Sequence, residues 1–217
     1  MPSVDHVLRV FTDPDGRFGD FLGVYLDTAD WSDELCQERA RDRGFSETVF
    51  IDDVATGRMR IFTPAMKVPF AGHPAVGAAW LLDALGHEVH SLTCDAGTIH
   101  VVATRQGATV LGDPAWVPGV ELRQVGSPAE VDAYAPWADS HHYVWAWLDE
   151  ASGVVRARAF LQAAGITEDE ATGGAAMLLA AERNRPVRIH QGAGSRLAAG
   201  PTHLGKAALS GDAVMDR

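Results

Sequence analysis

The sequence predicts an α+β protein made of two pseudo-symmetric lobes, each a curled mixed β-sheet or barrel around one central helix. Two observations predict this fold class. Short strand patterns alternate along the chain with few helices. In addition, a small-residue turn followed by an apolar helix occurs twice, in residues 71–82 and 171–181. A helix that is apolar on every side must be enclosed, and strands are the available enclosure.

The first elements form a hairpin and a helix. Residues 4–13 alternate apolar and polar residues as a strand does, 13–20 have turn composition, and 21–27 form a second strand. A helix follows over about 28–44, with Thr28 or Asp30 as its cap, arginines in its last turn and Gly44 at its end.

The rest of the first half reads as two strands at 45–53 and 57–64, an apolar helix at 75–85, and further strands over 90–113. Residues 113–140 are rich in proline and polar residues and carry no clear assignment. Strand patterns return at 142–149, 153–161, 186–192 and 196–215, around the second apolar helix. We expect an N-terminal lobe over 1–105 and a shortened C-terminal lobe over 106–217, whose final strands return to the first lobe.

The composition argues against several classes of partner. The 217 residues are 47% hydrophobic and 22% charged, which is typical of a globular protein. The net charge of −11 and the lack of a basic run argue against nucleic acid and anionic membranes. We find no membrane-spanning stretch and no signal-peptide pattern at the start, so we expect a cytoplasmic protein. Cys36 and Cys94 suit neither a disulfide framework nor a metal site.

The two small-residue turns admit two interpretations. A helix N-terminus presents unpaired N–H groups and a positive dipole end, and glycine lets a ligand approach the backbone closely. Two such ends facing one cleft would hold a small anion, most simply a carboxylate. Alternatively, the glycines and alanines serve close packing between helix and strand.

Three motifs resemble the PhzF (phenazine biosynthesis) family: SETVF at 46–50, RIFTP followed by PFAGHP over 60–74, and EDEATGGAA at 168–176. The resemblance covers nearly the whole chain. It implies the diaminopimelate-epimerase-like fold, an active site between the lobes, and an isomerase that uses no cofactor and no metal and forms a homodimer. Related epimerases carry a thiol at each helix mouth, where this chain has Ala71 and Ala171, so racemisation by two thiols is not expected.

Glu47 is the first candidate catalytic residue. In the strand it shares a face with Phe45, Val49 and Ile51, because alternate residues point the same way. Desolvation on an apolar face raises the pKa of a carboxylic acid, as a general acid/base near neutral pH requires. The alternative is a solvated glutamate on an irregular strand, and the family resemblance favours the catalytic role.

His73 and Asp169 complete the predicted catalytic set. An imidazole titrates near neutrality, and the dipole of a helix N-terminus disfavours its protonated form. In the AGHP motif His73 resembles a group that handles protons or binds substrate, although a lone histidine in a turn is often structural. By the same resemblance Asp169 binds a substrate amine or orients a proton carrier. Its alternative role is to cap the following helix.

The predicted substrate-binding residues lie around these three: Asp20, Ser46, Gly72, Thr172, Gly173 and Gly174. The chain departs from the family pattern at several positions. Gly174 replaces a serine, Glu170 a proline, Asp20 the asparagine of a GNP turn, and Lys67 an acidic residue. Lost polar groups and added carboxylates disfavour an acidic substrate at those points, which puts the phenazine substrate in doubt.

We therefore predict a cofactor-independent isomerase that shifts a proton on a small carboxylate-bearing metabolite. Glu47 would remove the proton while helix-end amides hold the carboxylate. The alternative is a small-molecule-binding protein that kept the cleft and lost turnover, which the departures at Asp20, Glu170 and Gly174 favour. A third hypothesis, a purely structural or oligomeric role, predicts a collapsed cleft.

Overall fold

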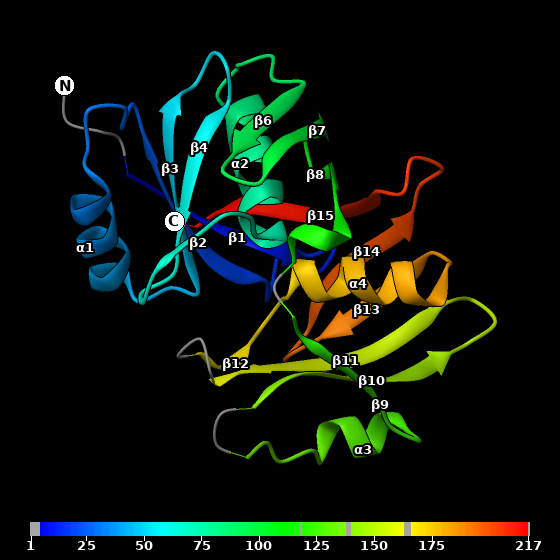
Figure 1. The fold of residues 1–217 in the computed structure, drawn as a ribbon. Helices are drawn as coiled ribbons and strands as arrows, with labels where there is room; N and C mark the ends of the chain where they lie inside the picture. Colours follow the sequence, from blue (N-terminus) through cyan, green and yellow to red (C-terminus); the bar gives the residue numbers. More distant parts are fainter. Residues whose placement is uncertain (1–4, 118, 138–139, 163–165, 217) are drawn as a thin grey trace.

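The N-terminal part of the protein is a closed eight-stranded barrel, seen in a computed structural model that describes residues 5–117, 119–137, 140–162 and 166–216. Val4, which begins the first predicted strand, lies outside these residues. The final strand pairs antiparallel with both its seventh and its first strand, which closes the barrel (Figure 1). In spatial order the strands are β1 (Asp5–Thr12), β2 (Asp20–Leu26), β3 (Glu47–Asp53), β4 (Arg58–Phe62), β6 (Ser91–Cys94), β7 (Gly97–Ala103), β8 (Gly107–Gly112) and β15 (Ala207–Met215).

Helix α2 (Gly72–Ala84) runs through this barrel and packs on most of its strands. Every residue from Gly72 to Leu82 is buried, as the all-round apolar sequence predicts. On β3, Val49 and Ile51 face this interior cluster, whereas Phe50 faces outward. The predicted alternation is therefore confirmed for Val49 and Ile51, which point toward α2. It is wrong for Phe45, which precedes β3 and stacks on Phe21 instead of joining the interior cluster.

Helix α1 (Asp33–Arg43) covers the outer face of β3 and β4. Its buried residues Cys36 and Ala40 pack with Phe50 and the neighbouring aromatic side chains. Gly44 ends the helix in a left-handed conformation, as expected. The predicted cap at Thr28 or Asp30 is wrong: Ser32 caps the helix, its hydroxyl accepting the N–H of Leu35. Thr28 instead donates its hydroxyl to Asp52.

The C-terminal part continues the sheet beyond β15 as an open, curled layer (Figure 1). Its strands, from β15 outward, are β14 (Ser195–Pro201), β13 (Val187–Gln191), β11 (Val154–Leu161), β10 (His141–Asp149) and β9 (Glu121–Gln124). Helix α4 (Gly173–Arg183) packs on β13, β14 and β15. It is the counterpart of α2, as the internal repeat predicts.

Three elements lie in the segment that carried no sequence assignment: the short helix η1 (Pro114–Trp116), β9, and α3 (Pro128–Asp132). Helix α3 packs on β10 and β11 through Val131, which contacts Val144 and Phe160. Tyr143 and Trp145 belong to the main core on the α4 side. The two faces of β10 are thus both covered. Two short strands, β5 (Lys67–Val68) and β12 (Ile166–Asp169), pair with β4 and β11.

Candidate active site

The N-termini of α2 and α4 meet at two glycines. A methyl group at Gly72 would lie 3.0 Å from the carbonyl carbon of Gly173 and 3.1 Å from the backbone nitrogen of Gly174. A methyl group at Gly173 would lie 2.9 Å from the backbone nitrogen of His73. Side chains there would separate the helices, and they would also lie 2.6 and 2.7 Å from Leu209 Cδ2 on β15. The two glycines therefore serve a contact between helices as well as the helix–strand packing of the second interpretation. The same contact brings both helix ends to one place.

Neither of these two N-termini has a side-chain cap. Ala71 and Thr172 occupy the N-cap positions of α2 and α4, and neither side chain accepts a hydrogen bond from its own helix. In contrast, Ser32 and Ser127 cap α1 and α3. The first amides of α2 and α4 are therefore left for other acceptors, as an anion site requires.

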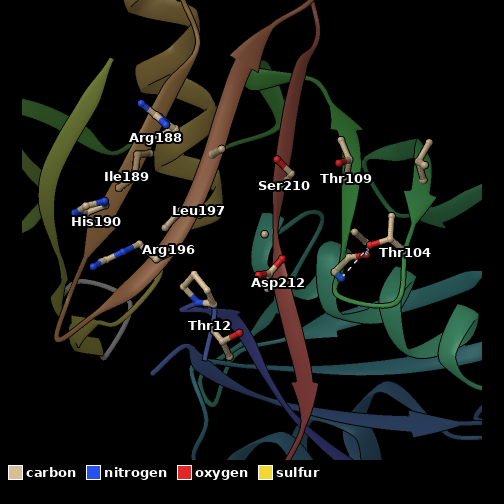
Figure 2. Close-up of a pocket in the computed structure, with 16 residues that line it drawn as sticks. Thr12, Thr104, Thr109, Arg188, Ile189, His190, Arg196, Leu197, Ser210 and Asp212 are labelled. Carbon is tan, nitrogen blue, oxygen red and sulfur yellow. Dashed lines mark hydrogen bonds between the residues drawn. The ribbon is translucent and has the colours of Figure 1, made fainter. Parts of the chain in front are cut away.

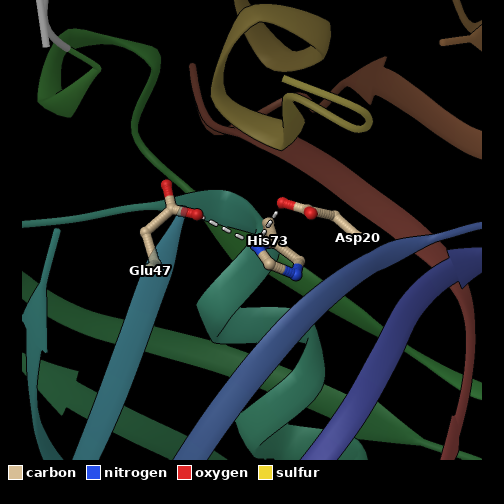
Figure 3. Close-up of side chains that lie close together, drawn as sticks. All are labelled: Asp20, Glu47 and His73. Atoms are coloured by element: carbon tan, nitrogen blue, oxygen red, sulfur yellow. Dashed lines mark hydrogen bonds and ion pairs between the residues drawn. The ribbon is translucent and has the colours of Figure 1, made fainter. Parts of the chain in front are cut away.

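Glu47 and His73 form a hydrogen-bonded pair at this junction (Figure 3). Glu47 is the first residue of β3 and His73 the second of α2, and His73 Nδ1 lies 3.0 Å from Glu47 Oε2. The histidine side chain is 3% exposed and the glutamate 16%. A carboxylate that is nearly desolvated and paired with an imidazole is a suitable proton carrier.

Asp20 lies on the other side of the histidine, at the start of β2. One of its carboxylate oxygens, Oδ2, is 3.7 Å from His73 Nδ1 and accepts the hydroxyl of Ser46. The other oxygen accepts the backbone N–H of Phe21 at 2.9 Å. Ser46 therefore contacts the site through Asp20, which stands where the family pattern has asparagine.

The carboxylates reverse the expected protonation of His73. Burial of the ring disfavours its charge, but the hydrogen bond to Glu47 and the charges of Asp20, Glu47 and Asp169 outweigh it and raise the pKa of His73 to about 9. The expected disfavouring of the protonated ring by the helix dipole does not decide its state, because Glu47 and Asp20 from other elements outweigh it. At pH 7 His73 is an imidazolium that donates to Glu47.

Asp169 ends β12 and is held by a chain of buried polar groups. Its Oδ2 accepts the hydroxyl of Thr172 at 2.6 Å, and Thr172 in turn accepts the side-chain amide of Gln191 at 2.8 Å. The amide oxygen of Gln191 accepts the hydroxyl of Tyr143 at 3.1 Å. Sequence reasoning missed Gln191 and Tyr143. Both follow ordinary strand patterns, and the polar network becomes visible only when β10, β13 and the α4 turn are brought together.

Burial, together with the charges of Asp20 and Glu47, raises the pKa of Asp169 to about 8. Burial and the charge of Glu47 raise the pKa of Asp20 as well, although His73 and the Ser46 hydroxyl oppose the change. Asp169 is thus a carboxylic acid at neutral pH and can donate a proton. The four groups together form a cluster of interacting titratable side chains with perturbed pKa values, as acid/base sites often do.

A cavity of about 120 Å³ opens at this junction. Glu47, His73 and Asp169 contribute to its wall, as do residues of both helix ends, including Gly72, Thr172, Gly173 and Gly174. Ala71 and Ala171 also line it, whereas Cys36 and Cys94 do not. Much of the remaining wall is apolar: Val68, Phe70, Val117, Val120, Leu161 and Ile166. An open cavity here argues against the collapsed cleft of a purely structural protein.

His141 also lines this cavity, at the first residue of β10. The strand predicted from sequence begins one residue later, at 142, and no pattern in the sequence marks His141 as a site residue. Burial and the neighbouring His142 lower the pKa of His141, so it is neutral at pH 7. Among the described residues that line the cavity there is no lysine or arginine. A bound anion would therefore depend on helix-end amides and histidines.

A larger cavity, of about 430 Å³, lies elsewhere, on the outer face of β8, β15, β14 and β13 (Figure 2). Its wall includes Thr109, Arg188, Arg196, Ser210 and Asp212, and it contains none of the predicted site residues. Glu47, His73 and Asp169 line the smaller cavity, which is therefore the candidate active site.

Asp20, Glu47 and His73 are also the described side chains that could best hold a metal ion, with one donor atom from each within 4.8 Å of the others. The donor atoms already have partners, however. His73 Nδ1 is bonded to Glu47, and the Asp20 oxygen that faces it accepts the Ser46 hydroxyl.

Two of the departures from the family pattern direct their charge away from the cavity. The carboxylate of Glu170 faces the turn between β13 and β14, where it accepts the backbone N–H of Ala193. Lys67 forms ion pairs with Asp33 at 3.3 Å and Asp95 at 2.9 Å. Gly174 does lie on the cavity wall, where a methyl group would come 3.0 Å from Val117.

These features define a class: an α+β protein whose two central helices meet end to end over an acid/base site. The chain belongs to the PhzC-PhzF family of phenazine biosynthesis-like proteins, whose model matches residues 8–149. The recognised family and the α+β fold class are confirmed.

Named relatives and a solved structure agree with this assignment. The chain is 33% identical to the trans-2,3-dihydro-3-hydroxyanthranilate isomerase of Pseudomonas aeruginosa, over 52% of this chain and 42% of that protein. It is 29% identical to the enzyme of the same name from Pseudomonas fluorescens, over 80% of each chain. A phenazine biosynthesis protein of the PhzF family from Bacillus anthracis has the same fold, with a TM-score of 0.79 at 19% identity, covering 100% of this chain and 98% of that one.

The chain thus spans less than half the length of the Pseudomonas aeruginosa relative that it matches. Within the described residues, no helix combines the length and the apolar character needed to cross a bilayer.

Proposed function

We propose that this protein is an isomerase that moves a proton within a small carboxylate-bearing metabolite without a cofactor. One observation carries the proposal: the hydrogen-bonded Glu47–His73 pair lies in a cavity between two uncapped helix N-termini. The pair supplies the proton chemistry, and the helix ends supply an anion site beside it. The isomerase names of the Pseudomonas relatives agree with this chemistry.

In the proposed mechanism Glu47 removes a proton from a carbon atom next to an activating group. The His73 imidazolium donates to Glu47 and fixes the orientation of its carboxylate in the cavity. The amides that begin α2 and α4 hold the substrate carboxylate. Asp169, protonated at neutral pH because its pKa is raised, donates a hydrogen bond to the activating group as negative charge develops there, and it keeps its proton. Glu47 then returns its proton at a different carbon.

The size of the cavity supports a compact substrate. Its volume of about 120 Å³ is well below the roughly 300 Å³ at which ordinary ligand pockets begin. The apolar wall favours a hydrocarbon ring or chain beside the carboxylate. We also propose that the protein acts in the cytoplasm as a homodimer, and gel filtration with light scattering tests the second of these proposals.

The second candidate function is a small-molecule-binding protein that no longer turns over its ligand. Gly174 favours it, because a hydroxyl donor is missing from the helix end that lines the cavity. Incubation in D₂O with trans-2,3-dihydro-3-hydroxyanthranilate and a panel of small carboxylates separates the two. The isomerase incorporates solvent deuterium into at least one of them, and Glu47→Gln abolishes this incorporation.

A suitable control is Glu34→Gln, which changes a glutamate in the first turn of α1, away from the cavity. This control variant should retain full deuterium incorporation. Prior dialysis against EDTA should also leave the rate unchanged, because no step uses a metal ion. Ligand binding without incorporation of deuterium would refute the isomerase proposal and favour the binding-protein proposal.

A further inference from the structure

The Glu170 carboxylate is bound by the turn between β13 and β14. The backbone N–H of Ala193 lies 3.0 and 2.9 Å from its two oxygens, and the N–H of Gly194 lies 3.3 Å from Oε1. The hydroxyl of Ser195 donates to the same oxygen at 2.8 Å. Hydrogen bonds to an ionised acceptor are among the stronger ones in proteins. Glu170 therefore ties the Asp169 turn to this hairpin.

The turn is shaped to admit this carboxylate. Gly192 has φ +54°, and a methyl group on it would collide with Oε2 of Glu170 and lie 2.8 Å from its backbone oxygen. A larger residue there would displace the glutamate side chain as well as strain the backbone. The glycine and the glutamate thus fit each other.

Ser195 links Glu170 to the loop between β1 and β2 of the barrel. Its buried hydroxyl gives its single proton to Glu170, so it accepts the backbone N–H of Gly19 at 3.0 Å. The ring of Phe18 packs over Gly194, where an added methyl group would overlap it. The loop between β1 and β2 is therefore fixed to the β13–β14 turn by a hydrogen bond and an apolar contact.

Gly19 immediately precedes Asp20 and is held in a left-handed conformation with φ +74°. A shift of Gly19 moves Asp20, whose Oδ2 lies 3.7 Å from His73 Nδ1. We propose that Glu170 is a positioning residue: through Ser195 it fixes Gly19 and thereby holds Asp20 against His73. The inference rests on the proposed function only in treating His73 as part of the acid/base site.

The test measures the titration of His73 by NMR in the full chain carrying labelled histidine. Ser195→Ala and Glu170→Ala each remove the connection. If the distance between Asp20 Oδ2 and His73 Nδ1 grows from 3.7 Å to roughly 5.5 Å, the pKa of His73 falls by about 1 at an effective dielectric constant of ~20. The other titratable groups that act on the ring are Glu47 and Asp169. Ser195→Ala removes no contact of either group, whereas Glu170→Ala also frees the turn beside Asp169, so Ser195→Ala isolates the effect of Asp20. Amide exchange at Gly19 should accelerate about tenfold.

Glu168→Ala is the matched control. It removes a nearby carboxylate whose partner is Arg158, at 2.7 and 2.8 Å, and not the hairpin. In this variant the pKa of His73 and the rate of amide exchange at Gly19 should equal those of the parent protein.

The proposal is overturned if folded Ser195→Ala leaves the pKa of His73 unchanged, even when Gly19 exchange accelerates, because the connection would then be structural alone. If Glu170→Ala fails to fold, Ser195→Ala alone tests the proposal, because this substitution removes only one oxygen atom. The titration needs no substrate, so its outcome is separate from that of the deuterium experiment on the proposed function.

Discussion

Replacing Gly72 with alanine tests whether the two central helices are in backbone contact. The added methyl group would lie 2.6 Å from Leu209 Cδ2, 3.0 Å from the carbonyl carbon of Gly173 and 3.1 Å from the nitrogen of Gly174. The leucine side chain can rotate away. The two backbone atoms belong to the first turn of α4 and move only with that helix.

Overpacking of this kind costs about 1–3 kcal/mol in the free energy of unfolding. For an m-value of about 3 kcal/mol per molar urea, the unfolding midpoint of Gly72→Ala should fall by roughly 0.3–1 M. Proton-transfer activity should fall as well, because the shift separates the two helix ends that hold the substrate. Urea titration followed by circular dichroism measures the first effect, and deuterium incorporation the second.

Gly119→Ala provides the control, because a methyl group at Gly119 would find no heavy atom within 4 Å. Its unfolding free energy should stay within about 0.5 kcal/mol of the parent value. Equal stability of Gly72→Ala and Gly119→Ala would refute the contact between α2 and α4, and with it the shared anion site.

Two further predictions concern pH and the thiols. Folding raises the pKa of His73 from 6.5 to about 9 and of Asp169 from 3.8 to about 8, so both bind protons more tightly when folded. The contribution of His73 to the free energy of unfolding is complete below pH 6.5. It is lost as the pH rises through about 9, which lowers the free energy of unfolding by about 3 kcal/mol. The raised pKa of Asp169 acts in the same direction. The urea midpoint should therefore be lower at pH 9.5 than at pH 6.5, and a higher midpoint would contradict the site electrostatics. Burial raises the pKa of Cys36 to about 11 and also raises that of Cys94, so the native protein should resist iodoacetamide at pH 8, whereas rapid labelling would place a thiol at the surface.

The parts of the fold with a local signal were predictable from sequence. The small-residue turns followed by all-round apolar stretches at 71–82 and 171–181 identified the helices that became α2 and α4. The alternation around Glu47 correctly predicted which strand face meets α2. Local signals were weaker at helix ends: several residues before α1, Thr28, Asp30 and Ser32 among them, have capping chemistry, and the hydroxyl of Ser32 makes the cap.

The electrostatics of the site could not be predicted in the same way. The pKa of His73 depends on Asp20 and Asp169, which are distant in sequence and are brought near it by β2 and β12. Glu170 follows Asp169 directly, yet its carboxylate turns toward Ala193 on another hairpin. Such contacts are set by strand pairing across the molecule, which no short pattern encodes.

The most direct test of the proposed acid/base pair is the titration of the His73 ring by NMR in the parent protein and in Glu47→Gln. We predict an imidazolium at pH 7, with a pKa of about 9, because Glu47 accepts the Nδ1 proton at 3.0 Å and other carboxylates surround the ring. In Glu47→Gln the pKa should fall by at least about 1, since the charge-assisted hydrogen bond is lost. A neutral His73 at pH 7 in the parent protein, or a pKa that Glu47→Gln leaves unchanged, would contradict the proposed acid/base pair.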